Sequence, residues 1–246
     1  MKPKPLILLF CLILSFFPFL TSARDVLQPN SLTCEYASNP LGITSQTPKL
    51  SWFIASSLRN TQQAAWQVLV ADNLTDLSKN IGNIWNSKKI NSNQSIQVPY
   101  KGRHLLSAKT YYWKVKIWDN HGNISSWSKT AMWRMGLLNS GDWLGAKWIA
   151  YEELPAAERI VPAIHLRGDF APQNDILPLF RRDFSIKRKL KNATAFISGL
   201  GHFDLSINGS KVGDHILDAG WTQYDKHALY VTFDITDQLK KGDNTI

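Results

Sequence analysis

The chain has 246 residues, of which 28 are Lys or Arg and 19 are Asp or Glu, giving a formal net charge of +9. The basic residues fall in short turns and at the polar alternate positions of predicted strands. The sequence contains no basic helix and no aromatic RNA-binding motif, so the charge indicates a solvated surface and gives no support to nucleic-acid binding. A chain of this length can hold its fold by packing alone.

The N-terminus has the pattern of a secretory signal peptide. Lys2 and Lys4 precede an apolar run over residues 6–20, and small residues follow up to Ala23. The run is shorter than the roughly 20 residues of a membrane-spanning helix, so a retained anchor is the weaker alternative. We predict cleavage near Ala23 and export to the periplasm or the medium. Cleavage removes two lysines and lowers the net charge from +9 to +7. Cys34 is then the one cysteine left, and we predict that it is a buried small hydrophobic residue.

Hydrophobic and polar residues alternate along three segments of the mature chain, and turn residues separate these segments. A period of two predicts strands with one buried face. Long helix-like patterns are absent from the sequence. We therefore predict an all-β fold that begins with a β-sandwich over residues 25–138. The alternating apolar residues of its three clearest strands are Leu50, Trp52 and Ile54, then Trp66, Val68 and Val70, then Tyr111, Trp113, Val115 and Ile117.

The spacing of Leu105 and Tyr111 narrows the type of sandwich. Leu105 stands six residues before Tyr111, and the strand that follows ends in a glycine turn. This arrangement resembles a fibronectin type III domain, in which the tyrosine hydroxyl at such a corner satisfies a backbone group. Trp66 and Trp113 are predicted to build the core and not to be platforms for sugars.

A second unit is predicted over residues 142–246, beginning at Asp142-Trp143. Its clearest local signal is Asn208-Gly209, a dipeptide typical of the tight hairpin turn in which both central residues have positive φ. We predict a second β-sandwich, of jelly-roll type. Its predicted features are a first strand at Lys147-Trp148-Ile149, a proline-rich loop over residues 155–178, and strands at 180–186, 193–198, 203–207 and 229–235.

A series of short motifs runs across both units: Leu32-Thr33-Cys34-Glu35-Tyr36, Asn39-Pro40-Leu41-Gly42-Ile43, Pro48-Lys49-Leu50-Ser51-Trp52, Gly199-Leu200-Gly201-His202-Phe203, Ile207-Asn208-Gly209, Gly220-Trp221-Thr222-Gln223-Tyr224, Asp234-Ile235-Thr236 and Gly242-Asp243-Asn244. Together they resemble the N-terminal part of bacterial α-L-rhamnosidases of glycoside hydrolase family 78. Each motif is modest by itself, but their order across two domains is specific. The resemblance spans nearly all of residues 32–246.

The resemblance implies an enzyme that removes terminal α-L-rhamnose from plant glycosides or polysaccharides with inversion at the anomeric carbon. Inversion uses two carboxyl groups about 6.5 to 9.5 Å apart, one as general acid and one as general base. In this family both belong to an (α/α)6 barrel that follows the sandwiches. We expect that barrel to be absent here, so that this chain alone is inactive, has no catalytic residues, and needs neither cofactor nor metal. The barrel would be its intramolecular partner.

The C-terminal residues suggest that the second sandwich is incomplete. Gly242-Asp243-Asn244 is predicted to be a turn that launches a strand, and the sequence ends two residues later. The acidic residues lie in polar loops or turns, where no environment separates two carboxyl pKa values as acid-base catalysis requires. We therefore expect a fragment of a longer enzyme.

Two other functions remain open: a stand-alone carbohydrate-binding module and an adhesion-type sandwich protein. A binding module presents aromatic side chains to sugars, and the candidates here are Trp221 and Tyr224, flanked by Asp218 and His227. We expect Trp221 to fold inward over the core, because most Trp residues in sandwiches are largely buried. The expected ligands are rhamnose-containing glycans, with no nucleic acid and no membrane contact after cleavage. An adhesion protein would more often repeat its unit, and no repeat is visible.

Overall fold

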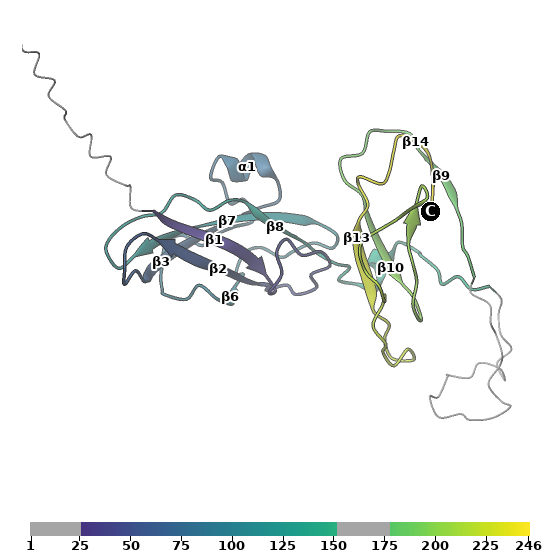
Figure 1. Cartoon of the computed structure of the whole chain (residues 1–246), viewed down its shortest axis with the longest axis horizontal. Coiled ribbons are helices and arrows are strands. Elements are labelled where there is room, and N and C mark those ends of the chain that lie inside the picture. The colour runs from purple at the N-terminus through teal and green to yellow at the C-terminus, as the bar shows by residue number, and fades with distance from the viewer. Residues whose placement is uncertain (1–25, 152–177) are drawn as a thin grey trace, which may run out of the picture.

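The computed structural model describes residues 26–151 and 178–246, which form two β units (Figure 1). The predicted signal peptide and the loop 155–178, apart from its last residue, lie outside the described residues. Within them helix is limited to α1 and the 3-10 turn η1, and the all-β prediction is confirmed. The first unit contains β1 (Leu27–Cys34), β2 (Lys49–Ser56), β3 (Gln63–Ala71), α1 (Leu74–Ser78), β4 (Trp85–Asn86), β5 (Ile90–Asn91), β6 (Val98–Pro99), β7 (Thr110–Asp119) and β8 (Ala131–Arg134), with η1 (Ser140–Trp143) after it. The second contains β9 (Asp183–Ile186), β10 (Thr194–Ser198), β11 (Ser206–Ile207), β12 (Ser210–Lys211), β13 (Tyr230–Asp234) and β14 (Gly242–Thr245).

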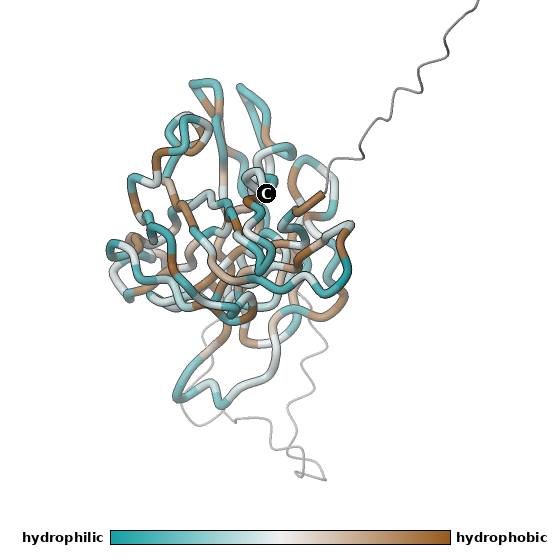
Figure 2. The backbone as a smooth tube through the Cα atoms, turned by 90° about the vertical axis from the view of Figure 1, so that its left-hand side faces the viewer, coloured by the Kyte–Doolittle hydropathy of each residue, from teal (hydrophilic) through white to brown (hydrophobic). Residues whose placement is uncertain are grey.

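The first unit is a sandwich of two sheets. One has the order β1-β2-β6, and the other has the order β4-β3-β7-β8 with β5 also paired to β3. The predicted alternation is confirmed, since Trp52, Trp66 and Trp113 lie in the shared core while Phe53 is 64% exposed. In Figure 2 the tube accordingly changes back and forth between hydrophobic and hydrophilic along the chain. Cys34 belongs to the same core, as predicted, and is a free thiol.

The corner before β7 also forms as predicted. Leu105 is fully buried, and Tyr111 is 1% exposed. The Tyr111 hydroxyl accepts a hydrogen bond from the backbone N–H of Leu106 at 2.9 Å. This contact satisfies a backbone donor that the turn would otherwise leave unpaired, and it fixes the start of the longest strand.

The outer face of β3 and β7 differs from the prediction, because α1 covers part of it. Leu69 lies between the predicted core residues Val68 and Val70, so the two-residue alternation places it on the solvent face, but it is buried against Leu77 of α1. Lys114 is buried on the same face, where its Nζ donates to the backbone oxygen of Leu77 at 2.6 Å and to Asn80 Oδ1 at 2.7 Å. Burial and the neighbouring Lys116 lower the pKa of Lys114. A short helix therefore converts a solvated face into a second, smaller core.

The second unit consists of three antiparallel pairs, β10 with β13, β11 with β12, and β9 with β14. The Asn208-Gly209 hairpin is confirmed, with φ of 52° and 83° at its two central residues. Buried side chains from β11 and β13 fill a separate core with Leu205, Val212 and Ile235. The second unit thus has its own hydrophobic centre beside that of the first.

Three strand predictions for this unit were wrong, the first because residues 203–205 of the predicted strand 203–207 are not strand and only β11 forms there. Lys147-Trp148-Ile149 is not a strand, and Trp148 is 64% exposed, because no neighbouring strand pairs with this segment in the described part of the chain. Residues 242–245, assigned to a turn and an unpaired strand, form β14, which pairs with β9 along its whole length. The N–H groups of Arg182 and Ile246 continue this ladder by donating to each other's carbonyl oxygens. The predicted open edge is therefore paired.

Candidate functional site

A buried arginine links the two units. Arg134 ends β8 of the first unit, its side chain is 6% exposed, and its Nε donates to Thr110 Oγ1 at 2.8 Å. Its Nη1 donates to Thr194 Oγ1 of β10 and lies 3.8 Å from Asp234 Oδ2 of β13. Thr194 and Asp234 face each other in the β10–β13 register. One guanidinium therefore contacts both strands of the sheet that adjoins the first unit, and its charge has a carboxylate partner.

Tyr230 of β13 forms the second part of this interface. Its hydroxyl accepts a hydrogen bond from the backbone N–H of Leu137 at 2.8 Å. Its ring meets the rings of Trp143 and Phe196 edge to face, with centroids 5.6 and 6.1 Å away. Burial raises the pKa of Tyr230 and outweighs the opposite effect of the Leu137 backbone, so the hydroxyl stays protonated at neutral pH.

Two glycines let the units approach this closely. A Cβ atom on Gly136 would overlap the Tyr230 hydroxyl, and one on Gly42 would lie 2.8 Å from Thr232 Oγ1. Gly42 also has a φ of 78°, a value that favours glycine. Backbone from the first unit therefore lies directly against side chains of β13.

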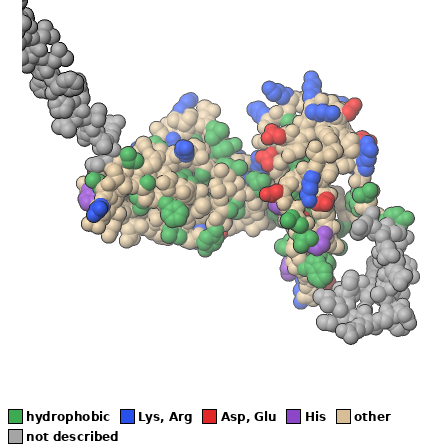
Figure 3. Space-filling model, in the orientation of Figure 1, with side chains coloured by type: hydrophobic (Ala, Val, Ile, Leu, Met, Phe, Trp, Pro, Cys, Tyr) green, Lys and Arg blue, Asp and Glu red, His purple; other side chains and the backbone are tan. Residues whose placement is uncertain are grey.

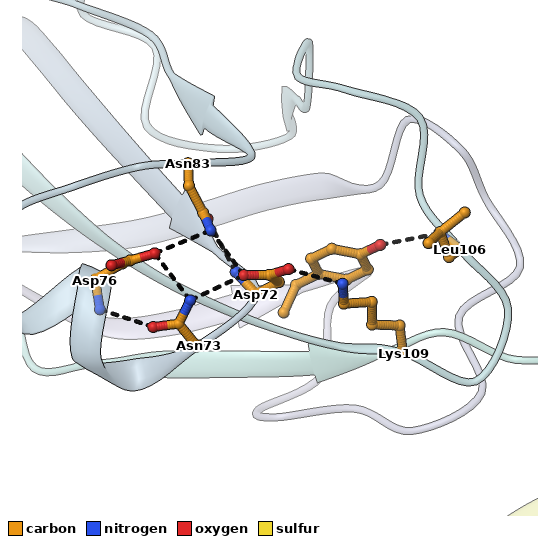
Figure 4. A network of polar contacts seen from close by, with 7 residues as sticks. Asp72, Asn73, Asp76, Asn83, Leu106 and Lys109 are labelled. Atoms are coloured by element: carbon orange, nitrogen blue, oxygen red, sulfur yellow. Dashed lines mark hydrogen bonds and ion pairs between the residues drawn. The ribbon is translucent and has the colours of Figure 1, made fainter.

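A network of polar contacts in the first unit surrounds Asp72 (Figure 4). Asp72 accepts hydrogen bonds from Lys109 Nζ at 2.7 Å and from the side-chain amides of Asn73 and Asn83 at 3.0 and 2.7 Å. The same two amides donate to Asp76 at 2.9 and 3.1 Å. The bond from Lys109 is the main cause that lowers the pKa of Asp72 to about 2. These donors hold α1 against the sheet and use both oxygens of Asp72 and one oxygen of Asp76, so the carboxylates are engaged in the structure of the unit.

Among the residues that the structure describes, the other carboxyl groups with shifted pKa values are shifted in the same direction. Hydrogen bonds from Ser107 and the Asn139 backbone lower the pKa of Asp142, and Thr245 with Arg181 lowers that of Asp183. Burial raises the pKa of Asp119, but bonds from the side chain and backbone of Asn123 and from the His121 backbone outweigh it and lower the pKa. A general acid needs a raised pKa to carry its proton at neutral pH. None of these groups is suited to protonate a leaving group.

The four residues predicted to bind sugar all lie in the segment between β12 and β13. The prediction that Trp221 folds inward is wrong, because its side chain is 70% exposed. Ala219, two residues before Trp221, is buried instead, and the core of the unit is filled by residues that include Ile207, Val212 and Phe233. Asp218 bonds His215 Nδ1 through both carboxylate oxygens, at 2.7 and 3.0 Å. Tyr224 is 37% exposed, and His227 is exposed too.

No hydrogen bond or ring contact joins any two of Asp218, Trp221, Tyr224 and His227 in the described structure. His227 instead receives a bond at its backbone oxygen from Thr222 Oγ1 at 2.6 Å. A sugar site needs polar groups that converge beside the aromatic ring. The assignment of these four residues to carbohydrate binding stays a prediction.

Sequence reasoning did not find a small cavity at the open edge of the first sandwich. It has a volume of about 270 Å³ and is lined by residues of β3 to β6, among them Trp66, Trp85 and Gln94. The buried Nε1 of Trp66 has no hydrogen-bond partner. The volume falls below the roughly 300 Å³ at which small-molecule sites begin, so it supports no ligand assignment.

In residues 26–151 and 178–246, no group of three His, Cys, Asp or Glu side chains is placed to hold a metal ion. No helix in the same ranges is long and apolar enough to cross a membrane.

Comparison with known families supports the resemblance seen in the motifs. Residues 29–139 match the Rha78A-like N-terminal immunoglobulin domain, and residues 188–246 match the alpha-L-rhamnosidase N-terminal domain. The first match names an immunoglobulin domain, which shares the sandwich architecture of the predicted fibronectin type III likeness. The exact domain boundaries at residues 138 and 142 stay predictions.

Individual proteins agree with the family matches. An α-L-rhamnosidase of Formosa agariphila is 37% identical over 220 residues, which cover 85% of this chain and 22% of the relative. One of Alteromonas sp. is 30% identical and covers 96% of this chain and 25% of the relative.

Solved structures show the same likeness. The α-L-rhamnosidase of Dictyoglumus thermophilum has a TM-score of 0.75 and 33% identity over 89% of this chain and 24% of its own. That of Aspergillus terreus has a TM-score of 0.70 and 25% identity over 89% of this chain and 23% of its own. The chain thus spans a quarter or less of the length of these relatives. It belongs to the α-L-rhamnosidase family, in which it corresponds to the N-terminal region.

Proposed function

We propose that the chain is the exported N-terminal accessory region of an inverting α-L-rhamnosidase that removes terminal α-L-rhamnose from plant glycosides or polysaccharides. The observation that carries this proposal is the interface between the two units. Arg134 and Tyr230 join two sandwiches, each matching a domain from the N-terminal part of such enzymes, into one body. A body of this kind is suited to support a neighbouring catalytic domain.

The catalytic step is assigned to a part of the enzyme outside this chain. Inverting hydrolysis uses a protonated carboxyl group and a carboxylate that flank the glycosidic bond. The pKa values of Asp72, Asp119, Asp142 and Asp183 are all lowered, so each of these groups holds a negative charge and lacks a proton to donate. In the relatives, about three quarters or more of the length lies outside the matched region and has room for a catalytic domain.

Export is supported by two features of the sequence and fold. Residues 1–23 have the signal-peptide pattern, with the predicted cleavage near Ala23. Cys34 is buried, and burial raises the pKa of its thiol to about 12. The thiol form reacts slowly with oxidants and disulfides, so the first unit is fitted to an oxidising compartment without a disulfide of its own. Sequencing the N-terminus of the exported protein tests the cleavage site.

Activity measurements test whether catalysis belongs to a part of the enzyme outside this chain. Purified residues 24–246 are expected to release no aglycone from an aryl α-L-rhamnoside. Replacing the matched N-terminal region of the Formosa agariphila enzyme by this chain should preserve turnover, whereas deleting that region should reduce it. Turnover by residues 24–246 that follows the protein through purification would contradict the proposal. The alternative, a stand-alone carbohydrate-binding or adhesion-type protein, predicts that the chimera is no better than the deletion.

A further inference from the structure

An apolar surface lies where the segment between β12 and β13 meets the turn after β10. We call it the loop face and define it by Leu200, Ile216, Leu217, Trp221 and Leu229. Their side chains are 58%, 88%, 68%, 70% and 46% exposed. Figure 3 shows hydrophobic side chains gathered with histidines at the lower end of the second unit. Exposed apolar patches on a soluble monomer rarely exceed a few hundred Å², and larger ones usually mark interaction sites.

The backbone beneath the loop face is held in place by specific contacts. The Asp218 carboxylate pairs with His215, and the Asp218 backbone oxygen accepts from the N–H of Phe203 at 3.1 Å. Ser198 Oγ donates to the backbone oxygen of Leu229 at 2.8 Å. These bonds tie the segment before β13 to the turn after β10, so the five apolar side chains are presented by a fixed framework. A preformed surface loses little conformational entropy when a partner covers it.

The composition of the loop face favours a protein over a sugar. Four of its five residues are Leu or Ile, which offer sugar hydroxyls no hydrogen bonds. The nearest predicted polar partner, Asp218, is engaged by His215, and its side chain is 13% exposed. Sugar sites pair an aromatic ring with free polar groups, whereas cores of protein interfaces are apolar and aromatic.

We propose that the loop face is the docking surface for the part of an α-L-rhamnosidase that lies outside the region matched by this chain. The inference rests on the proposed function and adds the surface through which the accessory region contacts the rest of the enzyme. The relatives indicate what would cover the loop face, since about three quarters or more of their length lies beyond the matched region. Burial of the loop face there removes its apolar side chains from water.

Hydrogen exchange in two proteins tests this surface. One is the full chain, and the other is the chimera in which the chain replaces the N-terminal region of the Formosa agariphila enzyme. Backbone amides of residues 213–229 are expected to exchange about ten-fold more slowly in the chimera than in the chain alone. The double variant Leu217→Ser, Trp221→Ser should abolish this difference and make the junction sensitive to protease. It should leave the melting temperature of the chain alone unchanged, because both side chains are exposed there.

The control variant is Phe53→Ser on β2 of the first unit. The exposed fraction of Phe53 is 64%, similar to the 70% of Trp221, but Phe53 lies outside the loop face. It should change neither the exchange difference nor the protease sensitivity. A second measurement does not depend on the chimera: the full chain should co-sediment with the Formosa agariphila enzyme lacking its own N-terminal region, and the double variant should not.

Four results would overturn the inference. Equal exchange of residues 213–229 in chain and active chimera, with no co-sedimentation, removes the docking surface but leaves the proposed function standing. Protection in the chain alone that grows with concentration assigns the loop face to a second copy. If L-rhamnose protects residues 213–229 in the chain alone, the loop face is a sugar site. If these residues are already protected in the chain alone at every protein concentration, another part of the chain itself covers the loop face. An inactive chimera beside an active parent enzyme counts against the proposed function instead.

Discussion

The Tyr230 hydroxyl accepts the backbone N–H of Leu137 at 2.8 Å, and this one bond connects a strand of the second unit to the backbone that leaves the first. The same tyrosine packs on Trp143. Asp142, beside Trp143, accepts from the N–H groups of Leu138 and Asn139 at 3.0 and 2.7 Å. Residues 137–143, where the backbone leaves the first unit, are therefore held by hydrogen bonds and ring contacts, and side chains that mutation can remove contribute to the orientation of the two units.

Tyr230→Phe is expected to loosen this connection while keeping the ring contacts. The substitution leaves the Leu137 N–H without its acceptor. We expect the free energy of unfolding to fall by about 1 kcal/mol, the lower end of the cost of an unpaired donor, because Leu137 and Tyr230 are only partly buried. Denaturant unfolding measures the loss, and small-angle scattering measures the spread of orientations. Tyr36→Phe is the control, since Tyr36 is 78% exposed. Equal losses in the two variants would remove Tyr230 from the interface.

Gly136→Ala should separate the units more strongly. The added methyl would overlap the Tyr230 hydroxyl and lie 3.1 Å from the backbone oxygen of Gly42, so the interface must open. Overpacking of this kind costs about 1 to 3 kcal/mol. Limited proteolysis between the units and calorimetry report the change. Gly141→Ala, which adds a methyl with nothing within 4 Å, should behave as wild type.

The parts of the fold that could be predicted are those fixed by local pattern. The burial of Trp52 and Trp113 follows from two-residue alternation, and the turn at Asn208-Gly209 follows from the need for positive φ at both positions. The burial of Leu69 depends on α1, which packs on β3 and lies in an unpatterned segment. The sequence does contain one sign of α1, the helix-capping residue Asn73, whose side chain accepts a hydrogen bond from the N–H of Asp76 at 2.8 Å.

The orientation of Trp221 could not be predicted for a different reason. An irregular link has no period that assigns one face to the core, so the average burial of Trp was the only guide. The structure places Ala219 in the core instead and leaves Trp221 exposed. Arg134 and Tyr230 were not predicted either, because contacts between separate units leave no periodic pattern in one sequence. These are also the residues on which the proposed function depends.

Tyr111→Phe tests the corner that was predicted from sequence. The ring is 1% exposed and keeps its packing in the variant, while the Leu106 N–H loses its acceptor. We expect a loss of about 1 kcal/mol in the free energy of unfolding, because the bond is only partly buried. Tyr112→Phe is the matched control, since the adjacent hydroxyl has no hydrogen-bond partner among the described residues. If both variants unfold at the same denaturant concentration, the corner bond contributes nothing measurable.

The Asp72 network should make stability depend on pH in the acid range. The folded-state pKa of Asp72 is lowered to about 2, below the roughly 3.9 of an unfolded aspartate. Its contribution is therefore fully present above about pH 4 and is lost as the pH falls toward 2. Side-chain exposures of 25% for Asp72 and 36% for Lys109 weaken the pair by solvent screening, so we expect a loss of about 1 kcal/mol. Asp72→Asn should be less stable than wild type at pH 7, and the difference should shrink on acidification to pH 2.

The control is Asp204→Asn, which removes the ion pair between Asp204 and Lys211. The Asp204 side chain is 70% exposed, so this substitution should leave the dependence of stability on acid pH unchanged. Parallel profiles for wild type and Asp72→Asn from pH 7 to pH 2 would show that Asp72 does not stabilise α1 through its charge.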